Sequence, residues 1–515
     1  MVEPPSSAAD DPAVRPRAVP PEHIGELELS LHAPLSERIP TGIATTVFLA
    51  GTCSHPTAEI QRLEVVVGAE RHVPDAWGMP RAGASAAWSG FWATIPVAAQ
   101  AQVGTLPARV EALLNDGRVV SAPAGAVEVH EPAPPPSLAA GVSLQPETVA
   151  ICMATYNPDP EMFAIQIESI REQSIDDWIC LISDDASAPG GLALIERTVA
   201  GDPRFVVSHS ADNRGFYRNF ERALEMVPAG ISFVALSDQD DRWYPDKLAT
   251  LRAAIGDAQL VYSDLRLVDP DGSVVADTLW GERRTNHTNL ASLMIANTVT
   301  GAAALFRRDL LDLALPFPEG PAGWKFHDHW LGGVALASGE VTFVDRPLYD
   351  YVQHREAILK GRISGDAEAA SGIAAAVVSL ARPRLREVVA SWKSPYFFGY
   401  RVLAFQARAL QVRCAPVLSR RKERALRLLL AAERSPHAFA WLVLRPLRGV
   451  VGRDETLGME RTLAKGILWR WLVGLRRRLH WSPGGTAYDA SLPAFDPKDF
   501  GTVRPRWWPR GRGSP

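Results

Sequence analysis

Four polar residues, Asp238-Gln239-Asp240-Asp241, follow the apolar run 231–236 and Ser237. The run is typical of a buried strand, which would deliver the carboxylates to the carboxyl edge of a sheet, where open α/β sheets bind ligands. Asp238 and Asp240 stand two residues apart, so both can reach one hard cation. A cation held by few carboxylates keeps open positions for phosphate oxygens. The turn therefore predicts a cation site that faces a phosphate-bearing ligand.

Two further polar motifs end the preceding strand candidates. Ala-Thr-Tyr-Asn-Pro (154–158) ends one, and Ser-Asp-Asp-Ala-Ser (183–187) ends the next. Both ends should lie at the same sheet edge as the carboxylate turn. There Asp184 or Asp185 can accept a hydrogen bond from a base or a ribose hydroxyl, and Tyr156 can stack on the base. The second motif is equally typical of a turn followed by a helix cap.

A third motif, Asn-Arg-Gly-Phe-Tyr-Arg-Asn (213–219), leads into a helical pattern. Gly215 allows a ligand to approach the backbone closely. Arg218 can pair with a phosphate. The alternative is an ordinary loop with a solvated arginine.

Strand and helix patterns alternate over residues 149–362, and this alternation is what positions the motifs. The strand candidates are residues 149–154, 178–183, 205–208 and 231–236, with helical patterns at 162–173 and 219–226. The alternation predicts an α/β fold with a mostly parallel sheet and right-handed crossovers.

Residues 25–131 show short alternating strands, and the turn Asn-Asp-Gly (115–117) indicates a hairpin. We predict a β-sandwich here. Either the sandwich is a sugar-binding or docking module, helped by Trp77, Trp88 and Trp92, or these tryptophans fill the core, as buried aromatic side chains commonly do.

The remaining segments differ in composition. Residues 1–24 are predicted to be disordered, residues 132–148 to form a Pro-rich linker, and residues 483–515 to form a flexible tail. Between them, residues 363–482 are predicted to be helical and basic. Of the chain's 54 Lys and Arg, 27 lie in residues 381–515, with only 9 of its 58 Asp and Glu. This asymmetry indicates an anionic partner for the C-terminal part.

The pattern at residues 463–481 predicts an amphipathic helix. Its apolar face holds Ile467, Leu468, Trp471, Leu472 and Leu475, and arginines flank that face. Such a helix either lies in a membrane interface or packs on its own protein.

Several absences guide the predicted location. The sequence has no apolar stretch long enough to span a bilayer and no signal pattern at its start. Its four cysteines lack pair spacing, which favours a reducing compartment. We expect a cytoplasmic protein, peripheral on the inner face of the plasma membrane.

Taken together, the motifs resemble those of family 2 glycosyltransferases of the GT-A fold. The resemblance covers residues 149–361. The carboxylate motif, which runs from Ser237 to Trp243 and is followed by Lys247-Leu248, is similar to the same motif in rhamnosyltransferase-like members. It implies an inverting transferase that moves a sugar from a nucleoside diphosphate donor to a hydroxyl. L-rhamnose from dTDP-rhamnose is the implied sugar, and a cell-envelope glycan or lipid-linked molecule is the implied acceptor.

The resemblance also implies residue roles on the donor side. Asp238 would touch the ribose or water around the metal, Asp240 would ligate Mg²⁺ or Mn²⁺, and His354 would be a third ligand or a diphosphate contact. The other implied donor-nucleotide residues are Ala154, Tyr156, Asp184, Asp185, Gly215, Arg218 and Gln239.

On the acceptor side, the resemblance implies that Asp328 is the general base. It lies in Phe-His-Asp-His-Trp (326–330), and its alternative role is a helix N-cap. The other implied acceptor-side residues are Trp243, Gly301 and His327. His327 and His329 are two residues apart and do not share a helix face, so they do not form a metal pair.

The sequence departs from the family pattern at Arg355-Glu356-Ala357, where relatives carry Gly and Asn, which puts the closing loop in doubt. The processive Gln-x-x-Arg-Trp motif is absent, which favours single additions.

Two other classes of protein remain as alternatives. One is a nucleotidyltransferase, although the usual Gly-rich basic loop is missing. The other is a non-catalytic glycan-binding or Ca²⁺-binding protein, although residues 238–246 lack the Gly of an EF-hand loop.

Overall fold

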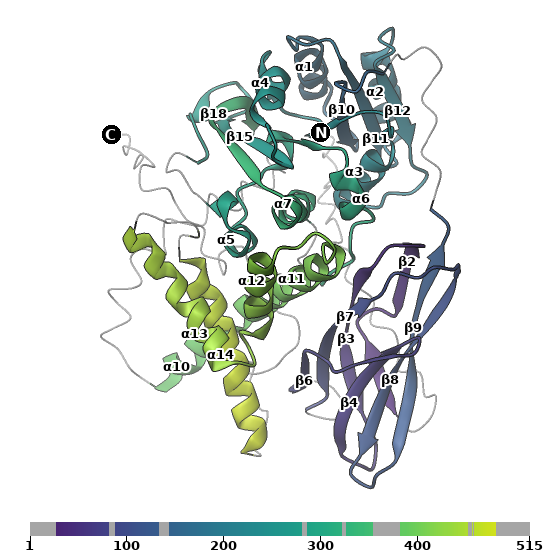
Figure 1. Ribbon diagram of the computed structural model, residues 1–515, viewed down its shortest axis with the longest axis vertical. Coiled ribbons are helices and arrows are strands. Elements are labelled where there is room, and N and C mark those ends of the chain that lie inside the picture. The colour runs from purple at the N-terminus through teal and green to yellow at the C-terminus, as the bar shows by residue number, and fades with distance from the viewer. Residues whose placement is uncertain are drawn as a thin grey trace, which may run out of the picture.

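The computed structural model has three parts in chain order: a β-sandwich, an α/β domain and a helical region (Figure 1). The structure describes residues 27–81, 88–132, 144–280, 286–321, 326–353, 382–451, 456 and 458–479. The predictions for residues 1–24, for His354, for the tail and for most of the linker lie outside the described residues.

The N-terminal part consists of two packed sheets. One sheet has the order β1 (Glu28–Leu31), β3 (Thr45–Ser54), β7 (Gly90–Val97), β6 (Ala76–Met79). The other has the order β2 (Leu35–Pro40), β9 (Val119–His130), β8 (Gly104–Leu114), β4 (Ile60–Val67), β5 (Glu70–His72). Strands β8 and β9 form the predicted hairpin, and Gly117 in its turn adopts φ +87°, which favours glycine.

The α/β domain is built on one sheet with the order β12-β11-β10-β13-β17-β15-β18-β14. Its strands are β10 (Val149–Thr155), β11 (Trp178–Asp184), β12 (Phe205–His209), β13 (Phe233–Ser237), β14 (Arg242–Trp243), β15 (Leu260–Val268), β17 (Ala304–Arg307) and β18 (Val341–Val352), and β16 (Val274–Ala276) pairs with β15. The first four strands in this order are parallel, as predicted. Strand β17 enters antiparallel to β13 and β15, so the whole sheet is mixed rather than mostly parallel.

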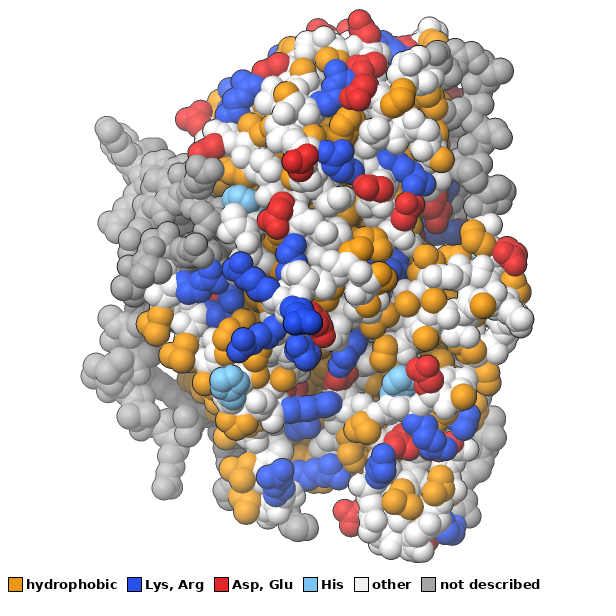
Figure 2. Space-filling view, viewed as in Figure 1, with side chains coloured by type: hydrophobic (Ala, Val, Ile, Leu, Met, Phe, Trp, Pro, Cys, Tyr) orange, Lys and Arg blue, Asp and Glu red, His pale blue; other side chains and the backbone are white. Residues whose placement is uncertain are grey.

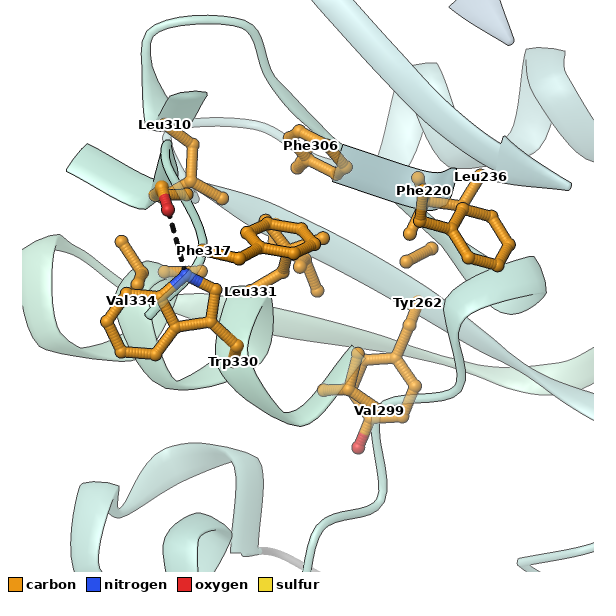
Figure 3. Close-up of a cluster of buried hydrophobic side chains, with 14 of the residues drawn as sticks. Phe220, Leu236, Tyr262, Val299, Phe306, Leu310, Phe317, Trp330, Leu331 and Val334 are labelled. Atoms are coloured by element: carbon orange, nitrogen blue, oxygen red, sulfur yellow. Dashed lines mark hydrogen bonds between the residues drawn. The ribbon is translucent and has the colours of Figure 1, made fainter. Parts of the chain in front are cut away.

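Helices cover this sheet and complete its core. They are α1 (Pro160–Arg171), α2 (Pro189–Val199), α3 (Phe216–Glu225), α4 (Lys247–Ala254), α5 (Leu290–Ile295), α6 (Leu310–Ala314) and α7 (His327–Ser338), with the short 3-10 turns η1 (Asn286–Thr288) and η2 (Gly301–Ala303). Figure 3 shows Trp330 of α7 packed among apolar side chains, with its indole N–H donating to the Ala314 carbonyl at 2.9 Å. The satisfied indole fixes the start of α7 against α6.

The C-terminal part is helical, as predicted. Its elements are α10 (Arg382–Ser391), the π-helical turn η4 (Pro395–Tyr400), α11 (Arg401–Arg413), α12 (Arg420–Ala431), α13 (Pro436–Leu444), η5 (Arg445–Val451) and α14 (Met459–Arg478). Among the described residues, no helix combines the length and apolar character needed to cross a membrane.

Helix α14 is the helix predicted to be amphipathic, and its first part packs on the rest of the protein, whereas Leu475 is 53% exposed. Ile467 is fully buried, and a Cβ on Gly466 would lie 2.6 Å from the Tyr396 backbone nitrogen, so α14 presses directly on η4. Arg470 lies 3.3 Å from the carboxylate of Glu433 rather than facing solvent. These contacts favour the second of the two predicted roles, a helix packed on its own protein.

The sandwich docks on the helical region through its predicted tryptophans. Trp92 is 1% exposed and donates to the Tyr396 hydroxyl at 3.1 Å, while Arg477 lies over the Trp77 ring at 5.2 Å. Trp92 therefore fills a core and cannot bind sugar. Trp88 is half-buried beside the same core.

Arg413 of α11 ties all three parts together. Its buried guanidinium donates to the carbonyls of Ala44 in the sandwich and of Leu313, Leu315 and Pro316 in the α/β domain, at 2.8–3.0 Å. Burial of this side chain lowers the pKa of Arg413 to about 10, so it stays charged at neutral pH.

We expect Arg413→Met to destabilise the protein by about 3 kcal/mol, because several buried carbonyls would lose a charged donor. The midpoint of thermal unfolding measures the loss. Arg427→Met, at a side chain 61% exposed, is the control and should change the midpoint little. Equal shifts for both variants would contradict this account of the junction.

Candidate functional site

A pocket of about 380 Å³ opens at the carboxyl edge of the four parallel strands. In the sheet, β11 and β12 lie on one side of β10, and the next strand of the chain, β13, lies on its other side. The pocket lies at this change of direction, which is where open α/β sheets bind ligands. Its lining comes from the motifs at 154–158, 183–187, 213–219 and 238–241, with Phe220 and the end of β18, whereas the motif at 326–330 contributes none of it. The lining residues are Ala154, Thr155, Tyr156, Asp185, Asn213, Gly215, Phe216, Asn219, Phe220, Asp238, Gln239, Asp240, Tyr351 and Val352.

The two aspartates after β11 have different positions. Asp184 is fully buried and accepts hydrogen bonds from the Ser187 N–H at 3.0 Å and hydroxyl at 2.5 Å, and its carboxylate lies 2.7 Å from His209 Nδ1. It therefore holds its own turn together, which is the alternative role that the motif also predicted. Asp185 reaches the pocket wall.

Asp185 also holds the loop that precedes α3. One carboxylate oxygen accepts the Arg214 N–H and the other accepts the Gly215 N–H, both at 2.8 Å. Gly215 adopts φ +80°, and a Cβ there would have open space around it, so the conformation rather than crowding favours glycine. The loop thus presents its backbone and the exposed ring of Phe216 to the pocket.

Arg218 points away from the pocket. It donates to Glu221 at 2.6 Å, to the Phe317 carbonyl at 3.0 Å and to Glu319 at 2.5 Å. Its position therefore gives no support to the predicted phosphate contact. The positive charge of Arg218 is thus neutralised by Glu221 and Glu319 rather than offered to a ligand.

Gln239 joins the carboxylate turn to the end of β10. Its side-chain oxygen accepts the Tyr156 N–H at 2.9 Å, and its side-chain nitrogen donates to the Tyr156 carbonyl at 3.3 Å. With its backbone held, Tyr156 keeps its ring half exposed at the pocket. That position suits stacking on a planar base.

Two carboxylates, those of Asp238 and Asp240, line the same pocket. Burial, together with the neighbouring carboxylates of Asp240 and Asp328, raises the pKa of Asp238 to about 7. A bound cation would relieve this repulsion, so the residues present fit a divalent metal held by Asp238 and Asp240. Within the described ranges, no cluster of three or more His, Cys, Asp or Glu side chains is arranged as a metal site.

Asp328 lies in the first turn of α7, whose N-cap is Phe326. It is therefore not the N-cap residue, but a carboxylate in the first turn is favoured by the helix dipole. One of its oxygens accepts the His329 N–H at 2.6 Å. Its carboxylate acts on Asp238 electrostatically, but Asp328 is not among the residues that line the pocket.

Gly301 and His327, both predicted on the acceptor side, lie against each other. A Cβ on Gly301 would fall 2.6 Å from His327 Nε2, so only glycine fits. The His327 ring stacks on Phe220 at 3.9 Å, and burial lowers the pKa of His327 to about 3, so the ring is neutral. His327 is therefore part of an aromatic wall and not a cationic group.

Trp243 and Asp241 lie behind the pocket. Trp243 is 2% exposed, so its position gives no support to the predicted acceptor-side role. Asp241 is buried and accepts the Val352 N–H, which ties the turn to the end of β18. Helix α4 begins only at Lys247, so Asp241 does not cap it.

Two residues of α3 were missed as parts of the site. Asn219 donates to the Thr155 carbonyl at 3.1 Å and accepts from the Ser183 hydroxyl at 2.6 Å, which joins β10 to β11. Arg222 donates to the Ser183 hydroxyl and the Asp184 carbonyl at the same edge. Asn219 and Arg222 stand three residues apart, so they lie on one face of the helix that follows the Asn-Arg-Gly loop. That spacing is the feature of the sequence from which their shared position could have been predicted.

Comparisons with known proteins identify the family of one segment. Residues 150–313 match the family model described as Glycosyl transferase family 2. This segment is a glycosyl transferase family 2 domain. The match spans the β10, β11 and β13 ends that form the pocket, and with the flanking sandwich and helices it confirms the predicted fold class.

Two curated relatives match parts of the family 2 domain. Uncharacterized protein y4gI of Sinorhizobium fredii is 31% identical over 120 residues, which are 22% of this chain and 13% of that protein. The dTDP-rhamnosyl transferase RfbG of Shigella flexneri is 34% identical over 99 residues, which are 19% of this chain and 34% of that protein. The chain thus spans about a third or less of these relatives' lengths.

Two solved structures match the chain at low identity and low TM-score. S. aureus TarS 1–349 in complex with UDP-GlcNAc has a TM-score of 0.40 at 16% identity and covers 65% of this chain and 92% of its own. Mannosyltransferase PcManGT from Pyrobaculum calidifontis, in complex with GDP-Man and Mn²⁺, has a TM-score of 0.33 at 17% identity, with 65% and 90% covered. At these TM-scores, neither likeness bears on the donor or metal of the family 2 domain.

Gly301→Ala should destabilise the domain by about 1–3 kcal/mol, because the added methyl group would displace His327 from its stack on Phe220. Thermal unfolding measures this loss. Gly190→Ala is the matched control, since a Cβ there meets no atom within 4 Å. A Gly301→Ala protein as stable as the control would show that the contact is not tight.

Proposed function

We propose that the family 2 domain transfers a sugar from a nucleoside diphosphate donor to an acceptor hydroxyl with inversion. The observation that carries this proposal is the pocket itself. Its lining combines the half-exposed ring of Tyr156 with the carboxylates of Asp238 and Asp240. That arrangement suits a ligand with a base at one end and a metal-bound diphosphate at the other.

Each residue has a role in this mechanism. Tyr156 stacks on the base, and Asp185 contacts the base or ribose from the facing wall. Asp238 and Asp240 would hold Mg²⁺ or Mn²⁺, and a cation there would supply positive charge to offset that of the departing diphosphate. Asp328 takes the proton from the acceptor hydroxyl as its oxygen attacks the anomeric carbon.

For the donor we propose dTDP-L-rhamnose. The proposal is supported by the form of the carboxylate motif and by similarity to a protein named as a dTDP-rhamnosyl transferase. For the acceptor we propose a glycan or lipid-linked molecule of the cell envelope, extended by single additions.

Asp240→Asn and Asp328→Asn should each lower sugar transfer by about 100-fold or more. Only Asp240→Asn should also weaken metal-dependent binding of dTDP, because Asp328 acts on the acceptor. Release of dTDP and calorimetric titration measure the two effects. Asp312→Asn, at a side chain 63% exposed, is the control. Full transfer by Asp328→Asn would remove this residue as the base.

We also propose that the helical region binds an anionic membrane surface on the cytoplasmic side. Helix α12 supports this better than α14, because Arg420, Arg424 and Arg427 are exposed and lie at helical spacing on one face. Figure 2 shows Lys and Arg side chains gathered near the middle of the view. Each basic residue near such a surface contributes about 1 kcal/mol.

Replacing Arg420, Arg424 and Arg427 by Ser should weaken binding to phosphatidylserine vesicles by about 100-fold, from the loss of three charges. Co-sedimentation measures the binding. The matched control replaces the sandwich arginines Arg38, Arg62 and Arg118, which are also exposed. Equal losses for both triple variants would contradict a specific surface on α12.

A further inference from the structure

Helix α3 presents two phenylalanine rings to the pocket. Phe216 and Phe220 both line it, and they stand four residues apart, so they lie on one face of the helix. Phe216 is 40% exposed, whereas Phe220 is buried. Asn219, which also lines the pocket from α3, is engaged by hydrogen bonds to Thr155 and Ser183. The surface that α3 offers to a ligand is therefore largely aromatic.

These two rings continue into a third, that of His327 in the first turn of α7. The His327 ring stacks on Phe220 with the ring centres 3.9 Å apart, and it lies edge-on to Phe216 at 6.3 Å. Neither ring nitrogen of His327 has a hydrogen-bond partner among the described residues, and both are shielded from solvent. The imidazole is thus held by packing. Phe216, Phe220 and His327 together form the aromatic wall, which leads from the pocket to α7.

The base and the diphosphate of a nucleotide do not explain this wall. Tyr156 already supplies a ring for the base, and the carboxylates of Asp238 and Asp240 suit a cation with a diphosphate. Charged and strongly hydrated groups gain nothing from contact with an exposed phenylalanine. Such a ring suits a ligand surface made of C–H groups, because removing two apolar surfaces from water is favourable.

The position of the wall indicates which part of the donor carries that surface. His327 directly precedes Asp328, the residue proposed to take the acceptor proton, and both lie in the first turn of α7. The wall therefore leads from the donor pocket toward the acceptor. The transferred sugar is the part of the donor that must lie between the diphosphate and the acceptor. In a 6-deoxyhexose, this sugar carries a methyl group at C6 in place of a hydroxymethyl group.

We propose that Phe216 is a specificity-determining residue that packs on the apolar face of a 6-deoxyhexose in the donor. The methyl group at C6 lies against the ring. A hydroxyl group at this position would lose its hydrogen bonds to water and gain no partner from the phenylalanine. An apolar surface of this kind discriminates against one added hydroxyl group by up to about 100-fold. This inference rests on the proposed function and names the residue that selects the sugar.

Calorimetric titration with Mn²⁺ present separates the sugar from the nucleotide. Phe216→Ala should weaken binding of dTDP-L-rhamnose by about 10-fold, because the apolar contact is lost, and should change binding of dTDP by less than about 2-fold. Ile165→Ala is the matched control, because Ile165 is 51% exposed on α1 and does not line the pocket. Equal losses for both ligands would place Phe216 against the base, and no loss would remove it from the site. Either outcome overturns the proposal.

Transfer rates test the choice of sugar. The unchanged protein should have a kcat/KM about 30-fold higher for dTDP-L-rhamnose than for dTDP-L-mannose, which adds only a hydroxyl group at C6. Phe216→Ala should reduce this ratio to about 3-fold, whereas Phe216→Leu, which keeps an apolar side chain, should retain most of it. A ratio that Phe216→Ala leaves unchanged would overturn the proposal.

The two assays distinguish failure of this inference from failure of the proposed function. If the unchanged protein binds dTDP-L-rhamnose but transfers no sugar, the proposed function fails, and the binding constants of Phe216→Ala still decide the role of Phe216. If the unchanged protein binds neither dTDP-L-rhamnose nor dTDP, the proposed donor and this contact are overturned together.

Discussion

Repulsion among carboxylates is the constraint on which the rest of the α/β domain depends. Burial and two neighbouring carboxylates raise the pKa of Asp238 to about 7, so the site is unfavourable unless positive charge is close by. The front of the turn is open to the pocket, since Asp238 and Asp240 both line it. A site with this imbalance is suited to a ligand that brings a cation and phosphates together.

Several polar residues of the motifs form hydrogen bonds to the backbone of other motifs as well as lining the pocket. Asp185 holds the loop at Gly215, Gln239 holds the backbone of Tyr156, and Asn219 joins two strand ends. These hydrogen bonds place groups that are far apart in the sequence within one pocket, before any ligand is present. Pre-organisation of this kind lowers the cost of ordering the site when the ligand binds.

The sequence predicted the β-sandwich, the four parallel strands and the polar strand ends well, because periodicity and turn residues are local signals. It could not predict that β17 enters antiparallel, because strand direction is set by tertiary pairing. It also could not separate Asp184 from Asp185, or see that Arg218 pairs with Glu319, since such partners are visible only once the chain is folded. Helix α14 illustrates the same limit: Gly466 lies against η4 and Trp471 packs on Phe439 of α13, contacts that the amphipathic pattern alone could not reveal.

The central claim is that Asp238 and Asp240 hold a metal that binds a nucleoside diphosphate beside Tyr156. A crystal structure with Mn²⁺ and dTDP, with anomalous diffraction measured near the manganese absorption edge, tests this directly. The account predicts an anomalous peak within coordination distance of Asp240, with the thymine ring against Tyr156 and the diphosphate bound to the metal. A peak elsewhere, or a nucleotide bound outside this pocket, would contradict it.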